Sequence, residues 1–157
     1  LGLTGEVRIR HSNAMAIFAT DDFEICTRLV QGEYYKYQNM FKELPLHTVI
    51  SRKELLDAMV RAKMCTAEKC PVKFEIAGSQ LGLSIKDQTT DYHETVDLQE
   101  NISEELTIGF DARLVIETLK AFDCDNVGIS LQSPKMPMII EAEDSDFKTI
   151  VLPVAIK

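Results

Sequence analysis

The sequence predicts an α+β domain in which a β-α-β-β-β unit occurs twice, with the helices on one face of antiparallel sheets. Two amphipathic segments of similar length predict the two helices. One strand-like segment precedes each helix, and three strand-like segments follow it. Because both helices have the same arrangement of strands around them, we interpret the chain as containing an internal repeat.

The first helix is predicted over residues 51–64, SRKELLDAMVRAKM. Ser51 is followed three residues later by Glu54, the pattern of a capping box at a helix N-terminus. Apolar residues recur at helical spacing on one face: Leu55, Leu56, Met59 and Ala62. The strand-like segments are HTVI before this helix and VKFEI, LGLSIKD and HETVDL after it, separated by AGSQ and QTTD.

The second helix is predicted over residues 111–122, DARLVIETLKAF, with Asp111 as its N-cap. Its apolar face consists of Val115, Leu119 and Phe122. The strand-like segments are LTIGF before this helix and VGISL, MIIEA and KTIVLPVAI after it, separated by QSPK and EDSD.

An offset of 60 residues superimposes the two helices and aligns their caps, apolar faces and charges. It pairs Ser51 with Asp111, Lys53 with Arg113, Leu55 with Val115, Asp57 with Glu117 and Met59 with Leu119. We expect the two halves to pack about a pseudo-twofold axis, because neither half can bury its sheet face alone.

The first 44 residues contain three strand-like segments with no helix before them: EVRIR, MAIFAT and FEICTRLV. They match the C-terminal part of a further unit of the same kind. The sequence therefore predicts an incomplete domain over residues 1–44 and a complete domain over residues 45–157. The chain has no initiator methionine, and we expect it to be a fragment.

The composition indicates a globular protein and argues against several classes. At 157 residues with 45% hydrophobic content, the chain is long enough to bury a core. The net charge of −8 argues against a conventional nucleic-acid binder, although it is compatible with a local basic face. No segment resembles a membrane span or a signal peptide, so we expect a soluble cytoplasmic protein without a membrane partner.

No pattern in the sequence predicts a catalytic, metal or cofactor site. The four cysteines form no CxxC pair, and we expect reduced, mostly buried thiols. His11, His47 and His93 are isolated, without the spacing of a catalytic triad or metal site. The acidic turn EAEDSD lacks the ligand spacing of a calcium loop. We therefore expect a protein that is not an enzyme and has no cofactor.

The chain ends in an apolar run, FKTIVLPVAIK, in which residues 149–156 carry no charge. Either the run is the last strand of a buried sheet, or its far end is a surface that another molecule binds. Pro153 cannot donate a backbone hydrogen bond, so strand pairing should stop there and leave the end free as a rim.

Four stretches, in this order, resemble bacterial DNA polymerase III β subunits, the sliding clamps: TRLVQGEYYKY, SRKELLDAMVRA, LTIGFDARLVIETLKAFDCDNVGISL and IVLPVAI. The resemblance implies the DNA-clamp fold, with residues 1–44 as the end of the middle domain and residues 45–157 as the C-terminal domain. In this family, two protomers of three similar domains form a ring. The ring has no catalytic activity; it encircles duplex DNA as a processivity factor and tethers other proteins to it.

Partners of the family dock short peptides rich in Gln, Leu and Phe into an apolar pocket. These partners include the polymerase III catalytic subunit, the clamp loader and repair polymerases. For this chain the resemblance implies the docking residues Tyr35, Asn39, Met40, Pro137, Met138, Ile150, Val151, Leu152, Pro153, Val154, Ala155 and Ile156. Tyr35 replaces a proline that is common in the family, and Asn39 replaces a frequent arginine.

The resemblance also implies a DNA-facing set on the two helices: Lys53, Arg61, Lys63, Arg113 and Lys120. From the residues alone, the spacing of Lys53, Asp57 and Arg61 equally fits a salt-bridged solvent face. A closed ring holds DNA by linkage, so weak and screened phosphate contacts would suffice. Met64 and Cys65 match an apolar contact of the full-length homodimer, and the alternative is that they belong to the core.

A competing interpretation is a β-rich protein-interaction module with no role on DNA. Such a module would use the same apolar rim at the end of the chain. The two interpretations differ in what lies upstream of Leu1: about two more domains of the same repeat would favour the clamp, and an unrelated domain the alternative.

Overall fold

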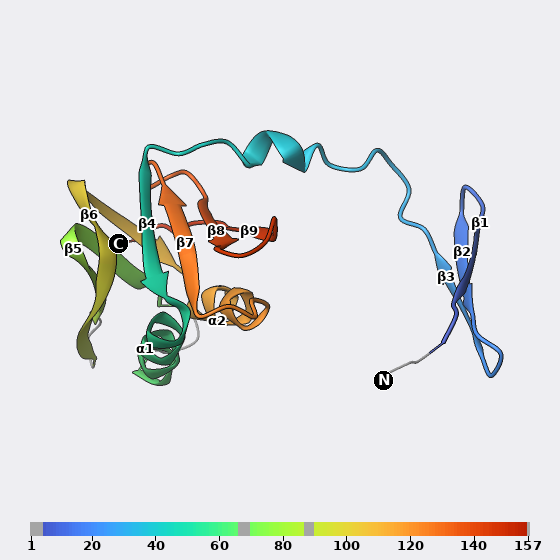
Figure 1. Cartoon of the computed structure of the whole chain (residues 1–157), viewed down its shortest axis with the longest axis horizontal. Coiled ribbons are helices and arrows are strands. Elements are labelled where there is room, and N and C mark those ends of the chain that lie inside the picture. Colours follow the sequence, from blue (N-terminus) through green and yellow to red (C-terminus); the bar gives the residue numbers. More distant parts are fainter. Residues whose placement is uncertain (1–4, 66–69, 87–89, 157) are drawn as a thin grey trace. The chain divides into compact units, whose positions relative to one another are not determined.

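The computed structural model describes residues 5–65, 70–86 and 90–156. The chain forms two compact units, Leu1–Lys36 and Tyr37–Lys157 (Figure 1). The predicted division into domains at residues 44 and 45 remains a prediction, because a compact unit is not the same as a domain of a longer protein.

The first unit is an antiparallel sheet of three strands in the order β1-β2-β3. Its strands are β1 (Arg8–His11), β2 (Met15–Ala19) and β3 (Glu24–Arg28), as the three predicted segments require. Ile9, Phe18 and Ile25 are opposite one another across the strands and are all at least partly open to solvent.

The second unit contains one antiparallel sheet of six strands in the order β5-β6-β4-β7-β8-β9. Its elements are the 3₁₀ helix η1 (Tyr37–Met40), β4 (Leu46–Ser51), α1 (Arg52–Cys65), β5 (Val72–Lys86), β6 (Asp91–Phe110), α2 (Ala112–Lys120), β7 (Asn126–Leu131), β8 (Met138–Ala142) and β9 (Lys148–Val151). Helices α1 and α2 lie side by side (Figure 1).

The strand pairing agrees with the predicted duplication. In each half, the strand before the helix pairs with the strand that follows the helix of the other half. Thus β4 pairs with β7 from Leu46–Leu131 to Ser51–Asn126. The end of β6 pairs in the same way with the start of β5, from Ile76–Leu106 to Val72–Phe110. This reciprocal exchange is the pairing that a pseudo-twofold axis produces.

The structure corrects the number of strands after the first helix. The predicted segment VKFEI and the first six residues of LGLSIKD are parts of one long strand, β5, while Asp87 lies outside the described residues. HETVDL and LTIGF lie toward the two ends of one strand, β6. The register of β5 shifts on both sides of Gly78, which has a φ of 60° that a side chain disfavours. The residues AGSQ therefore belong to a continuous strand and are not a loop between two strands. The extra residues at this irregularity lie on β6, where the stretch from Leu106 to Asp97 faces only Ile76 to Gln80 of β5.

The helices begin and pack as their sequences predict. The Ser51 hydroxyl accepts a hydrogen bond from the Glu54 amide at 3.3 Å, and the Asp111 carboxylate accepts one from the Arg113 amide at 2.9 Å. Leu55, Met59, Val115 and Leu119 are fully buried, and the rings of Phe74 and Phe110 meet edge to face at 5.1 Å in the same core.

The expectation of mostly buried thiols is wrong, because Cys26 and Cys65 are exposed and Cys70 and Cys124 are only partly buried. All four are free cysteines. Among the described residues, no helix is long and apolar enough to span a membrane.

Candidate docking surface and helix face

The apolar run at the end of the chain is a strand up to Val151 and is open to solvent after it. Val151 is the last residue of β9; it pairs with Met138 of β8 and is 2% exposed. The next residue, Leu152, is 57% exposed, and Val154 and Ile156 are also open to solvent. We call residues 152–156 the terminal segment. The prediction of a strand over residues 148–156 therefore holds only to Val151.

Backbone chemistry explains why the strand ends there. Pro153 has no amide hydrogen, so it cannot extend the ladder to β8. The next amide, that of Val154, donates to the carbonyl oxygen of Gly109 on β6 at 2.8 Å. The terminal segment thus leaves its neighbour in the sheet and is held against a different strand.

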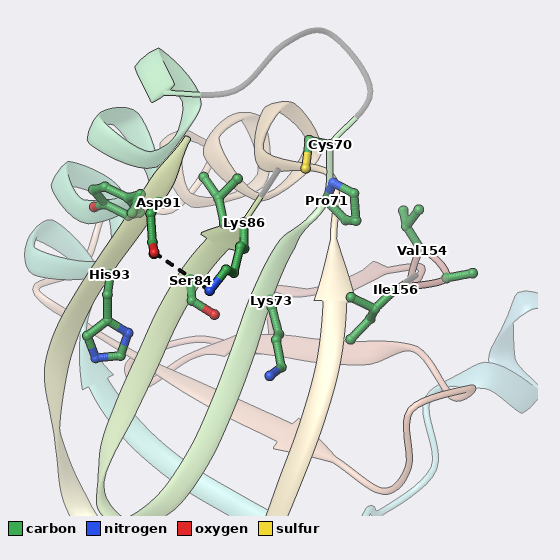
Figure 2. Close-up of a pocket in the computed structure, with 12 residues that line it drawn as sticks. Cys70, Pro71, Lys73, Ser84, Lys86, Asp91, His93, Val154 and Ile156 are labelled. Atoms are coloured by element: carbon green, nitrogen blue, oxygen red, sulfur yellow. Dashed lines mark ion pairs between the residues drawn. The ribbon is translucent and has the colours of Figure 1, made fainter. Parts of the chain in front are cut away.

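A cavity of about 950 Å³ lies beside the terminal segment. In Figure 2, Val154 and Ile156 stand on one side of it, and Asp91 and His93 of β6 stand on the other. Its lysines have acidic partners: Lys73 binds Glu75 at 2.7 Å, and Lys86 lies 3.7 Å from Asp91. The apolar wall of the cavity therefore faces two lysines that each have an acidic partner.

The second candidate site is the set of cations on the two helices: Lys53, Arg61, Lys63, Arg113 and Lys120. We call this set the helix face. All five side chains are exposed. A charged group on an exposed helix can reach a polyanion without losing its hydration, which suits weak and reversible contacts with phosphates.

Carboxylates hold both arginines of the helix face. Arg61 forms a two-point contact with Glu94 of β6, with 3.0 Å between Arg61 Nε and Glu94 Oε2. Arg113 binds the N-cap Asp111 at 2.8 Å. Arg61 thus pairs across to the sheet, whereas the spacing in the sequence had suggested Asp57 of the same helix.

Titration behaviour reflects these contacts. The hydrogen bonds from Arg61 hold the pKa of Glu94 below its ordinary value, and those from Arg113 do the same to the pKa of Asp111. Tyr92 also reaches Glu94. Burial, followed by the hydrogen bond to Glu94, raises the pKa of Tyr92 to about 12.

Comparison with known proteins identifies the family. Residues 42–155 match the family model of the DNA polymerase III β subunit, C-terminal domain. The chain belongs to the DNA polymerase III β-subunit family. A β sliding clamp of Streptococcus pneumoniae is 26% identical over 155 residues, covering 94% of this chain and 41% of that protein.

Solved structures of sliding clamps share the fold. A crystal structure of a DNA polymerase III β subunit from Eubacterium rectale superimposes with a TM-score of 0.85 at 27% identity, over 94% of this chain and 41% of that one. A sliding clamp from Bartonella birtlesii, crystallised with griselimycin, gives a TM-score of 0.87 at 21% identity over 99% of this chain and 42% of that one. The predicted DNA-clamp fold is therefore confirmed.

The residues predicted to dock peptides lie in three environments in the structure. Exposed or partly exposed positions are Asn39, Met40, Pro137, Ile150, Leu152, Pro153, Val154, Ala155 and Ile156. Met138 and Val151 are buried behind them as a cross-strand pair. Tyr35 is 70% exposed and belongs to the first unit. Their assignment as docking residues remains a prediction.

Met64 and Cys65, the predicted contact between clamp protomers, end α1. Met64 is 81% exposed and Cys65 is also exposed, so the alternative that they belong to the core is wrong. Among the residues that the structure describes, no group of three or more His, Cys, Asp and Glu side chains could hold a metal ion.

Sequence reasoning missed two residues of these sites. Glu94 holds Arg61, and no local pattern reveals a pair 33 residues apart. Gly109 holds the terminal segment, and here a signal existed: an isolated glycine inside a strand, in LTIGF, often marks a close approach of another backbone.

Proposed function

We propose that this chain is part of a ring-shaped clamp that encircles duplex DNA and carries other proteins through peptides docked on its terminal segment. The chain spans about two fifths of the length of the curated sliding clamps it matches (41% for the Streptococcus pneumoniae protein). The ring, its DNA and its partners therefore belong to the proposal. Family membership supports the proposal, and so do the exposed apolar side chains of the terminal segment.

The observation that carries the proposal is the exposure of the terminal segment. Leu152 at 57%, Val154 at 40% and Ile156 at 39% leave three apolar side chains open directly after β9, whose last residue, Val151, is buried. Burying one Leu or Phe of a peptide against such a wall would contribute about 1.5–3 kcal/mol. Two such anchors together would contribute about 3–6 kcal/mol, which corresponds to dissociation constants between roughly 6 mM and 40 μM.

The partners that fit this surface are proteins with a short segment containing Gln, Leu and Phe. In the proposal these are the DNA polymerase III catalytic subunit, the clamp loader and repair polymerases. The Bartonella clamp bound to griselimycin supports the general idea that this fold presents a ligand-binding surface. The conclusion for the present chain rests on its own exposed residues.

The helix face is proposed to line the hole and face the DNA. Its cations belong to an acidic chain of net charge −8, so tight phosphate binding is not expected. A ring needs no tight binding, because it is held on DNA by linkage, and strong contacts would oppose sliding. Arg61 and Arg113 fit such weak contacts with DNA, because their charges are already partly neutralised by the carboxylates of Glu94 and Asp111.

The remaining parts of the proposal concern the whole clamp. The first unit would complete the end of the middle domain, and exposed Met64 and Cys65 would contact a second protomer in the homodimer. The clamp would be a non-catalytic processivity factor in the cytoplasm.

The test is a chemical-shift titration of the isotopically labelled chain with a short Gln-Leu-Phe peptide. We expect shifts at Met138 and residues 150–156 that disappear when residues 154–157 are deleted from a chain that still folds. Absence of shifts there at millimolar peptide would contradict docking on this chain.

A parallel titration with a short DNA duplex at low salt should shift the resonances of α1 and α2. Unchanged resonances of both helices would contradict the DNA-facing role.

A further inference from the structure

The terminal segment crosses β6 at a residue without a side chain. Ile108 and Phe110 are fully buried in the core, so Gly109 between them faces the opposite side of the sheet. Gly109 is nevertheless buried. The terminal segment supplies this cover, because the Val154 amide donates to the Gly109 carbonyl at 2.8 Å.

The crossing leaves no room for a side chain at Gly109. A Cβ added there would lie 2.8 Å from the carbonyl oxygen of Val154 and 3.0 Å from Cγ1 of Ile156. The first distance is shorter than real Cβ contacts allow, and its partner is a backbone atom that moves only with the whole segment. Gly109 does not have a positive φ, so space is the requirement and not backbone conformation.

Other glycines of the sheet differ. A Cβ at Gly82 of β5 would meet its neighbours at 3.5 Å or more, an ordinary contact. A Cβ at Gly128 of β7 would lie 3.0 Å from side-chain atoms of Glu141 and His47, which can rotate away. Gly109 is the glycine of these three whose added side chain would meet a backbone atom of the terminal segment.

We propose that Gly109 is a positioning residue for the docking surface. Its missing side chain lets the terminal segment lie against β6, and its carbonyl fixes the Val154 amide, which sets where Leu152 and Pro153 stand. The role in docking rests on the proposed function. The role in holding the segment does not, and it can be tested separately.

The experiment compares Gly109→Ala with Gly82→Ala, the same substitution in the same sheet without the clash. Hydrogen exchange of the Val154 amide reports the position of the segment, and titration with the Gln-Leu-Phe peptide reports docking. We expect Gly109→Ala to remove protection of the Val154 amide and to weaken peptide binding about tenfold or more, the loss expected when an apolar anchor no longer meets its wall. Gly82→Ala should do neither.

A second background separates positioning from general damage to the fold. In a chain lacking residues 154–157 the clashing atoms are gone, so Gly109→Ala should leave the melting temperature unchanged there. If it unfolds that chain as well, the cause lies elsewhere and the proposal is overturned. Retained protection of the Val154 amide in full-length Gly109→Ala, or lost protection with unchanged peptide binding, would also overturn it.

Failure of the proposed function would look different. If the unsubstituted chain binds no peptide, docking on the terminal segment fails. The exchange of the Val154 amide in Gly109→Ala would then still decide whether Gly109 holds the segment.

Discussion

The terminal segment and the helix face belong to one domain but are organised in opposite ways. The terminal segment is apolar and yet exposed, and one backbone hydrogen bond, from Val154 to Gly109, holds it to β6. The helix face is charged and exposed, and carboxylates from Glu94 and Asp111 restrain its two arginines. The terminal segment therefore exposes apolar side chains to solvent, whereas the helix face exposes positive charges that nearby carboxylates partly neutralise.

Under the proposed function, this difference would suit two kinds of binding. Uncovered apolar side chains gain free energy from each group that a partner buries against them, so the terminal segment suits specific docking. Exposed cations with nearby carboxylates gain little from any single phosphate, so the helix face suits contacts that form and break easily. The substitutions below should affect one surface without affecting the other.

The largest expected effect concerns the buried pair behind the terminal segment, Met138 and Val151. Met138 is fully buried against Val151, and Met138→Ala should lower the free energy of unfolding by about 2–5 kcal/mol because it leaves a cavity. Met136→Ala is the matched control, since Met136 is 40% exposed and its truncation should change stability by less than about 0.5 kcal/mol. Denaturant unfolding measures both free energies. Equal losses would contradict the assignment of Met138 to the core and of Met136 to the surface.

The next effect separates binding from stability. Leu152→Ala should leave the free energy of unfolding within about 0.5 kcal/mol of the parent chain, since Leu152 is 57% exposed. It should weaken binding of the Gln-Leu-Phe peptide about tenfold or more. Met64→Ala removes a side chain that is 81% exposed at the end of α1 and should leave the peptide affinity unchanged. A similar loss in both variants would mean that the peptide has no defined site.

A smaller effect concerns DNA. Lys53→Ala and Lys120→Ala should each reduce the salt dependence of duplex binding by about one unit of slope, as expected when one phosphate contact is lost. Lys42→Ala removes an equal charge outside the helices and should reduce it less. Fluorescence anisotropy at several low salt concentrations measures the slope. If all three variants behave alike, net charge and not the helix face governs binding.

The smallest effect is a pH dependence within the helix face. The hydrogen bonds from Arg61 lower the pKa of Glu94 below its ordinary value of 4.5 in the folded chain. Glu94 therefore stabilises the fold fully above about pH 4.5, and this contribution disappears as pH falls through the lowered pKa. The stability difference between the parent chain and Glu94→Gln should be constant near neutral pH and shrink in acid. A difference that does not change down to pH 2 would show that the contact with Arg61 contributes nothing.

Local patterns in the sequence predicted the parts of the fold that local physics determines. The caps at Ser51 and Asp111 and the apolar faces of both helices follow from spacing alone, and the repeat followed from comparing them. The continuity of β5 was not predictable in this way. AGSQ has the composition of a loop, but Gly78 and Gln80 pair with Ile102 and Asp97 of β6, which keeps the segment within one strand.

The candidate sites were predictable to a similar extent. Pro153 indicated where the ladder stops, and the exposed Leu152 agrees with that expectation. Beyond Pro153, the terminal segment is held by a hydrogen bond to Gly109, a residue far away in the sequence. Arg61 had an acidic residue at helical spacing, Asp57, but the fold places Glu94 of β6 closer to its guanidinium. Tertiary partners of this kind leave little signal in a single sequence.

We propose that one domain presents a docking surface and a DNA-facing surface that act separately. The most direct test is to titrate one labelled sample first with the Gln-Leu-Phe peptide and then with a short duplex at low salt. We expect two separate sets of shifts, at Met138 and residues 150–156 for the peptide and on α1 and α2 for the duplex. Peptide shifts centred on the helices, or a terminal segment that responds to neither ligand, would contradict it.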